Sequence, residues 1–273
     1  MSDESGVPLI THHSLLITEE LAERFWADAG GPPPYPRDLQ AAIAYACPLG
    51  VVEIGGLSVA AVETWLAERC PRLRGAGSVQ HGCRLGVAER SLRACLVARA
   101  GEGLVFVDAA DPPAERRFSL AHEIAHFLAD YRRPRERAAA RLGPAVLAVL
   151  DGLRPPTAVE RIDAVLARVP LGIHVHLLER TADGLAARAA IARAERHADQ
   201  LALELLAPRA AVASALAARA LPPAGSPARR AAVAALLVAD FGLPPAIATA
   251  YAATFSPPEP AAAPFLRRLG LRA

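Results

Sequence analysis

Two histidines and a glutamate form the spacing in this chain that most clearly indicates chemistry. Residues 118–126 read FSLAHEIAH and contain the pattern HExxH at His122, Glu123 and His126. Residues four apart on an α-helix lie one above the other, so both imidazoles can bind one metal ion at about 2.0 to 2.1 Å. Glu123, one step round the helix, can then accept a proton from water. The spacing predicts a metal-dependent hydrolase.

A hydrolytic zinc site needs a third protein ligand and one open position. The best donor lies in a second predicted helix that Pro208 ends, where Glu195, Asp199 and small or apolar residues share one stripe. We expect the alanines of this stripe to let the two helices approach, so that Glu195 reaches the metal. Asp199, one turn on, is expected to accept the outer N–H of a ligand histidine. His197 and Glu204 lie on the far side of this helix and are not expected to be ligands.

The segments RFSLAHEIAHFLAD and ERHADQLALELLAP resemble the two signature segments of the ImmA/IrrE zinc metallo-endopeptidases, whose usual forms read RFTLAHELGH and ExxANxFAxxLLMP. The resemblance implies that His122, His126 and Glu195 bind Zn²⁺ and that Glu123 is the general base. The Glu-x-x-x-Asp spacing that ends at Asp199 is also that of gluzincin peptidases. Leu201-Ala202 and Ala207 depart from the usual residues by apolar changes that packing tolerates. Glu195 follows His126 by 69 positions, a longer connection than is typical, which affects the substrate cleft more than the metal site.

The resemblance also implies a substrate. A zinc-dependent endopeptidase of this type hydrolyses a peptide bond in a partner protein, here an Xre-type helix-turn-helix repressor encoded separately, and so acts in transcription regulation or a stress response. The alternative is a non-cleaving, zinc-containing sensory or binding module that regulates such a repressor. The intact base Glu123 argues against the alternative. A hydrolase acting on DNA-bound proteins is a third hypothesis, for which a stronger basic surface is expected.

The composition of the 273 residues, 53% hydrophobic and 21% charged, allows a large buried core. The four cysteines have no CxxC spacing, which favours a reduced, cytoplasmic protein. Neither a signal peptide nor a long apolar run is evident, so no membrane association is expected. The net charge is +2 and the arginines are scattered, so direct nucleic-acid binding is not expected either.

The elements that must position these residues are read from caps, turns and periodicity. Helices are expected near 17–29 and 38–47 and from the cap Ser58 to about residue 70. Residues 93–99 and 104–108 flank a glycine-rich turn and predict a β-hairpin. The HExxH helix should begin with Asp111 as its cap and Pro112 in its first turn, and end before Pro134. Its expected core face consists of Leu120, Ile124, Phe127, Leu128 and Tyr131.

The connection between the expected ligands, residues 132–190, is patterned. It predicts helices near 137–152 and 157–168, then a second hairpin around 173–177 with a turn at 181–184. His174 and His176 share one face of its first strand. One of them could stabilise an oxyanion, although a half-exposed pair without a role is the simpler interpretation. The arginines of residues 132–137 are expected at a solvated helix junction.

The fold class expected from these elements is α+β: a mostly helical zincin-like domain with a small sheet before the HExxH helix. We expect this metallopeptidase domain to span residues 1–207, including the insertion 132–190. A helical C-terminal region should follow at 208–273, with a helix from Ser226-Pro227 to Gly242 and a loose tail from residue 256.

Overall fold

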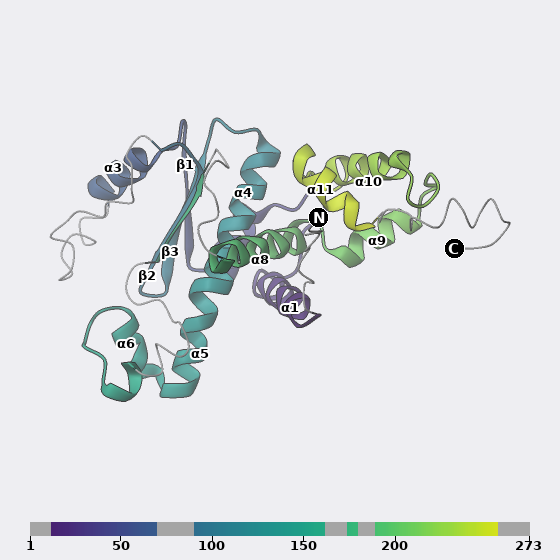
Figure 1. Cartoon of the computed structure of the whole chain (residues 1–273). Helices are drawn as coiled ribbons and strands as arrows, with labels where there is room; N and C mark the ends of the chain where they lie inside the picture. The colour runs from purple at the N-terminus through teal and green to yellow at the C-terminus, as the bar shows by residue number, and fades with distance from the viewer. Residues whose placement is uncertain (1–11, 70–89, 162–173, 180–188, 256–273) are drawn as a thin grey trace, which may run out of the picture. The chain divides into compact units, whose positions relative to one another are not determined.

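The computed structural model describes residues 12–69, 90–161, 174–179 and 189–255 (Figure 1). The chain divides into two compact units, one of residues 1–32 and 38–204 and one of residues 33–37 and 205–273. The fold is mostly helical and contains one four-stranded mixed sheet, as the α+β prediction expects. The assignment of domains 1–207 and 208–273 stays a prediction.

The sheet of the first unit has the strand order β1-β3-β2-β4. Strands β2 (Leu92–Arg99) and β3 (Glu102–Asp108) form the predicted hairpin, with Arg99 opposite Glu102. In the turn between them Ala100 has a φ of 53° and Gly101 a φ of 89°. Both values are positive, and glycine adopts such values freely. Strand β1 (Leu49–Ile54) pairs parallel to β3, and β4 (His174–Glu179) pairs antiparallel to β2. Strand β1 was not predicted from the sequence.

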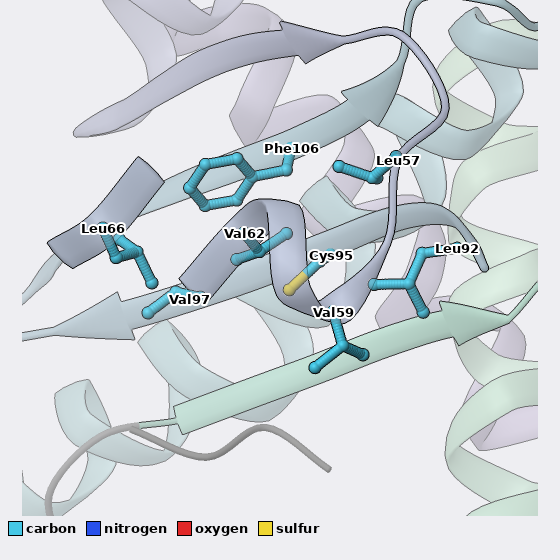
Figure 2. Packing of buried hydrophobic residues seen from close by; sticks show 8 residues of the cluster. All are labelled: Leu57, Val59, Val62, Leu66, Leu92, Cys95, Val97 and Phe106. Atoms are coloured by element: carbon cyan, nitrogen blue, oxygen red, sulfur yellow. The ribbon is translucent and has the colours of Figure 1, made fainter. Parts of the chain in front are cut away.

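Helix α3 (Val59–Arg69) covers one face of this sheet. Its start at Ser58 is confirmed, because the Ser58 hydroxyl accepts a hydrogen bond from the Ala61 N–H. The cluster between helix and sheet is shown in Figure 2 and consists of Leu57, Val59, Val62, Leu66, Leu92, Cys95, Val97 and Phe106. Partly buried side chains of β1, β3 and β4 pack against the same cluster, so apolar residues at alternate positions of all four strands meet a single helix.

Alternation along β4 decides where its histidines lie. Val175 and Leu177 pack against the α3 cluster. Successive side chains on a strand point to opposite faces, so His174 and His176 face the other side of the sheet. Helix α4 (Pro113–His126), which carries HExxH, packs against β2, β3 and β4 there. The sheet therefore delivers His176 to the helix that holds the motif.

The start of α4 differs from the prediction. The helix begins at Pro113 and its cap is Pro112, with no side-chain hydrogen bond at the cap, so Asp111 is not the N-cap. Pro112 is extended, at φ −54° and ψ 150°. A residue that precedes a proline is sterically disfavoured in the helical region, so the Pro112-Pro113 pair moves the helix start by one residue.

The end of α4 also differs. The helix does not stop before Pro134 but continues through a π-helical segment, η2 (Phe127–Arg132), into α5 (Arg133–Leu142). Proline lacks an N–H and crowds the preceding turn, and the wider π turns just before Pro134 accommodate that break. The expected core face, Leu120 to Tyr131, is buried as predicted.

The arginines of residues 132–137 are not all solvated. Arg135 is buried, pairs with Asp151 at 2.7 Å and lies over the Tyr131 ring. Arg132 pairs with Glu136 at 2.9 Å and donates to the Ala46 carbonyl. The prediction fits the exposed Arg137 and is wrong for Arg135, because helical periodicity alone does not show which neighbours cover a charged face.

The rest of the connection is described in part. After α5 come a 3₁₀ turn, η3 (Pro144–Val146), and the short α6 (Leu147–Leu150). Residues 158–161 are helical, while the remainder of the helix expected at 157–168 lies outside the described residues. The second hairpin is described only by β4, because its expected turn at 181–184 also lies outside them.

Further helices precede and follow these elements in the chain. Helices α1 (His12–Asp28) and α2 (Leu39–Ala46) belong to the first unit, and Asp38 caps α2 by accepting from the Gln40 and Ala41 N–H groups. Helix α8 (Ala189–Leu206) contains Glu195 and Asp199, and Ala198, Ala202 and Leu206 of its predicted stripe are buried. Helix α9 (Arg209–Ala217) lies in the second unit.

The second unit also contains α10 (Pro227–Ala239) and α11 (Pro245–Phe255), which pack against each other. Ser226 caps α10 as predicted by accepting from the Arg229 N–H. The tail from residue 256 lies outside the described residues. Within the described part of the chain, no single helix is long and apolar enough to span a membrane, although Ala194–Leu206 and Arg209–Ala217 pass that test as a bent pair.

Candidate metal centre

The two motif histidines converge inside the first unit. The Nε2 atoms of His122 and His126 lie 3.1 Å apart, and each residue is only 2% exposed. One helical turn separates them, so both rings leave the same face of α4. This face of the helix is therefore buried and not exposed to solvent.

A carboxylate contacts the Nδ1 atom of each of these rings and orients the ring. Asp199 on α8 lies 3.0 Å from His122 Nδ1, and Asp130 in η2 lies 2.7 Å from His126 Nδ1. An Nδ1–H that donates to a carboxylate leaves Nε2 with its lone pair free, which is the tautomer that binds a metal ion. The predicted contact of Asp199 is therefore present. Asp130 was not assigned a role from the sequence, although its place four residues after His126 was a usable signal.

Glu195 brings an oxygen donor from α8 to the same point. Its Oε2 lies 3.3 Å from His122 Nε2 and its Oε1 lies 3.8 Å from His126 Nε2. Ligand atoms of a tetrahedral zinc ion with bonds of 2.0 to 2.1 Å lie about 3.3 Å apart. Two imidazole nitrogens and a carboxylate whose oxygens lie at these separations from them fit a small divalent cation.

The charge of the site also favours a cation. Burial lowers the pKa of His122, but its hydrogen bonds to Asp199 and Glu195 outweigh burial and raise that pKa to about 9. Burial raises the pKa of Glu195, but hydrogen bonds with His122, His126 and His176 hold it well below its usual range. The Glu195 carboxylate thus stays ionised beside the ring nitrogens and attracts positive charge, whether a proton or a metal ion.

The predicted base lies at the edge of this cluster. Glu123 is fully buried, and its two carboxylate oxygens lie 3.1 and 3.0 Å from His176 Nδ1. The other ring nitrogen of His176, Nε2, lies 3.0 Å from Glu195 Oε1. Burial lowers the pKa of His176, but Glu123 and Glu195 outweigh burial and raise it to about 10. One imidazole therefore joins the expected base to the expected third ligand.

The two strand histidines have different surroundings. Donor atoms of His122, His126, His176 and Glu195 all lie within 4.8 Å of one another, a group that can hold a metal ion. His174 is not part of this group: its ring lies 5.8 Å from that of Tyr131, and its buried Nε2 has no hydrogen-bond partner among the described residues. His197 is outside the group as well. The chemical role of each residue in the cluster stays a prediction.

Comparison with known proteins bears on the motif segment. Residues 88–146 match the family model described as the IrrE N-terminal-like domain, Peptidase_M78. The match over this segment supports the resemblance to the ImmA/IrrE family that the motif indicates. The IrrE N-terminal-like match covers β2, β3, α4 and α5 with His122, Glu123 and His126, and it ends before His176 and Glu195. No curated protein and no solved structure matches the chain. The match indicates a metallopeptidase-type function, and the His/Glu cluster is able to bind the metal ion that such a function needs.

Proposed function

We propose that this chain is a zinc-dependent endopeptidase that cuts a partner protein. The observation that carries the proposal is the convergence of His122 Nε2, His126 Nε2 and the Glu195 carboxylate, with the Glu123 carboxylate buried beside them. Three protein ligands from two histidines and one glutamate are a donor set of catalytic zinc sites, which keep a fourth position open.

Each residue of the cluster has a definite task in this proposal. His122, His126 and Glu195 would hold the ion, and Asp199 and Asp130 keep the two imidazoles in the metal-binding tautomer. When bound, zinc supplies a Lewis acid that polarises a carbonyl group and lowers the pKa of water. Glu123 takes the proton from the attacking water and passes it to the nitrogen of the leaving amine. Its complete burial keeps competing solvent away from that transfer.

The sheet supports a peptide as the substrate. Strand β4 is at one edge of the described sheet and carries His176 into the cluster. An extended peptide can add to a sheet edge by main-chain hydrogen bonds, and it would then run past the metal centre. We propose, from the family resemblance, that the peptide belongs to a separately encoded Xre-type helix-turn-helix repressor in the cytoplasm, and that cutting it releases the repressed genes.

The test compares the wild type with Glu123→Gln, both loaded with zinc and incubated with a cell extract of the source organism. Protein N-termini are labelled and identified by mass spectrometry, and a purified Xre-type repressor from the same organism is treated in parallel. The wild type should create new N-termini in a repressor, and Glu123→Gln should create none while binding as much zinc. New termini in other proteins alone would reject the repressor as substrate. Bound zinc without any cleavage by the wild type would reject the peptidase and leave the non-cleaving module.

A further inference from the structure

The imidazole of His176 contacts both carboxylates that the proposed peptidase needs. We propose that His176 is a positioning residue that holds the Glu195 and Glu123 carboxylates together, and that it is not a fourth metal ligand. The inference rests on the proposed function and assigns a role to the long connection between His126 and Glu195, which supplies this residue.

The contacts of His176 leave it little freedom. Its Nδ1 faces both oxygens of Glu123 at 3.1 and 3.0 Å, and its Nε2 faces Glu195 Oε1 at 3.0 Å. An ionised carboxylate only accepts hydrogen bonds, so a ring nitrogen that carries a proton donates to it. The other oxygen of Glu195, Oε2, is the one nearer to His122 Nε2. Glu195 can thus turn Oε2 toward the ion while His176 holds Oε1.

Ring stacking argues against His176 as a ligand. Its ring lies face to face with that of His126, with centroids 3.6 Å apart and 23° between the planes. An imidazole binds a metal ion through a lone pair in the plane of its ring. The two stacked rings hold their lone pairs in separate, nearly parallel planes, so both rings would not direct them at one ion. The arrangement suits an ion bound by His126 and a hydrogen-bonding role for His176.

Strand register explains why this histidine and not its neighbour reaches the site. His176 lies opposite Leu96 on β2 and His174 lies opposite Ala98, so the two differ only by one step along the same face of β4. Both are partly buried. Glu123 and Glu195 hydrogen-bond with His176, whereas the ring of His174 contacts that of Tyr131. His174 is therefore a matched control for every change at His176.

Replacing His176 by Asn or by Gln tests its contacts with Glu123 and with Glu195 separately. The amide nitrogen of Asn occupies nearly the place of His Nδ1, and that of Gln nearly the place of His Nε2. His176→Asn should keep the donor to Glu123 and lose the one to Glu195, whereas His176→Gln should do the reverse. His176→Phe keeps the ring and removes both donors.

The first measurement is zinc affinity, by competition with a chromogenic chelator. Loss of a group that orients a metal ligand weakens metal binding by about 10- to 100-fold. We expect that loss in His176→Phe and His176→Asn, recovery of most of the affinity in His176→Gln, and wild-type affinity in His174→Phe. In a Glu195→Ala background, His176→Phe should cause no further loss, because the carboxylate it holds is gone. Equal affinities of His176→Phe and His174→Phe would overturn the proposal.

The Co²⁺ absorption spectrum and kcat distinguish a positioning role of His176 from a role as metal ligand. The visible absorption of the Co²⁺-substituted protein should be the same in wild type and His176→Phe, and an altered band would show that His176 is a ligand. With a peptide that spans an observed cut site, kcat should fall less in His176→Asn than in His176→Gln, and the opposite order would also overturn the proposal. If zinc binds but nothing is cut, the proposed function fails while the affinity series still decides the contact with Glu195.

Discussion

Each motif histidine has a carboxylate on its outer nitrogen, and these two contacts decide which ring atom can bind a metal. Asp199 reaches His122 from another helix, whereas Asp130 reaches His126 from the next turn of the same continuous helix. The local contact is independent of how α8 packs. At the scale of the residue, Asp130 therefore gives the cleaner test of ligand orientation.

Replacing Asp130 by Ala should weaken zinc binding by about 10- to 100-fold, because His126 loses the partner that fixes its tautomer. The zinc affinity of Asp130→Asn should lie between those of the wild type and Asp130→Ala, since the amide oxygen still accepts a hydrogen bond but has no charge. Zinc affinity measured by chelator competition checks both. Glu102→Ala, which removes an exposed carboxylate from β3, is the control and should bind zinc as the wild type does. An equal loss in the control would show that net charge, not orientation, is responsible.

Zinc affinity should depend on pH above neutral pH, where an ordinary histidine is already deprotonated. A protonated imidazole cannot bind a metal, and the pKa of His122 is raised to about 9 from the ordinary value near 6.5. Lowering the pH protonates His122 and weakens zinc binding, so affinity should still rise between about pH 7 and pH 9. Asp199→Asn removes the main group that raises this pKa and should move the rise to lower pH. A flat wild-type affinity from pH 7 to pH 9 would contradict the assignment.

The raised pKa of His122 has the opposite effect on the stability of the metal-free protein, which falls as the pH rises. A histidine pKa that folding raises stabilises the folded state fully below the unfolded value of about 6.5. That contribution is lost as the pH rises through about 9. Unfolding of the metal-free protein by urea at several pH values checks the direction, with Asp199→Asn as the variant in which the loss should be smaller.

At the scale of the elements, a sheet between two helices positions the site. Alternate residues of the strands meet α3 on one face and α4 on the other, so the α3 cluster fixes the sheet that supports HExxH and His176. Phe106 is central to this cluster: it is fully buried and meets Trp65 edge to face, with ring centroids 5.2 Å apart.

Phe106→Ala should lower the free energy of unfolding by about 3 to 5 kcal/mol, because it leaves a cavity in a closely packed core. Urea denaturation of the zinc-free protein measures this. The control is Tyr45→Ala, whose side chain is 79% exposed and whose removal should change the free energy by less than about 0.5 kcal/mol. Similar losses in the two variants would show that the α3 cluster is not the main core of the first unit.

Local sequence signals predicted the elements that local interactions decide. The glycine turn after β2, the caps Ser58 and Ser226 and the periodicity of α4 and α8 all depend on residues within one or two turns. Strand β1 has no such signal, because its partner β3 is some fifty residues away and its pairing is parallel. The π-helical passage through Pro134 was missed because a proline usually ends a helix, and here the wider turns absorb it.

At the scale of the whole molecule, the site joins segments that are distant in sequence. HExxH and the Glu195/Asp199 stripe could each be predicted from spacing, and their approach was expected from the alanines between them. Which of His174 and His176 reaches the cluster could not be predicted, because only the pairing of β4 with β2 decides it. The same long connection that departs from the family pattern supplies the histidine that contacts both Glu123 and Glu195.

The central claim is that Glu195 completes a zinc site with His122 and His126. Metal analysis of purified wild type beside Glu195→Ala tests it most directly, with Gln200→Ala on the same helix as the matched control. We expect about one zinc ion per chain in the wild type and the control, the stoichiometry of a single three-ligand site, and a large loss in Glu195→Ala. Undiminished zinc in Glu195→Ala would contradict the account.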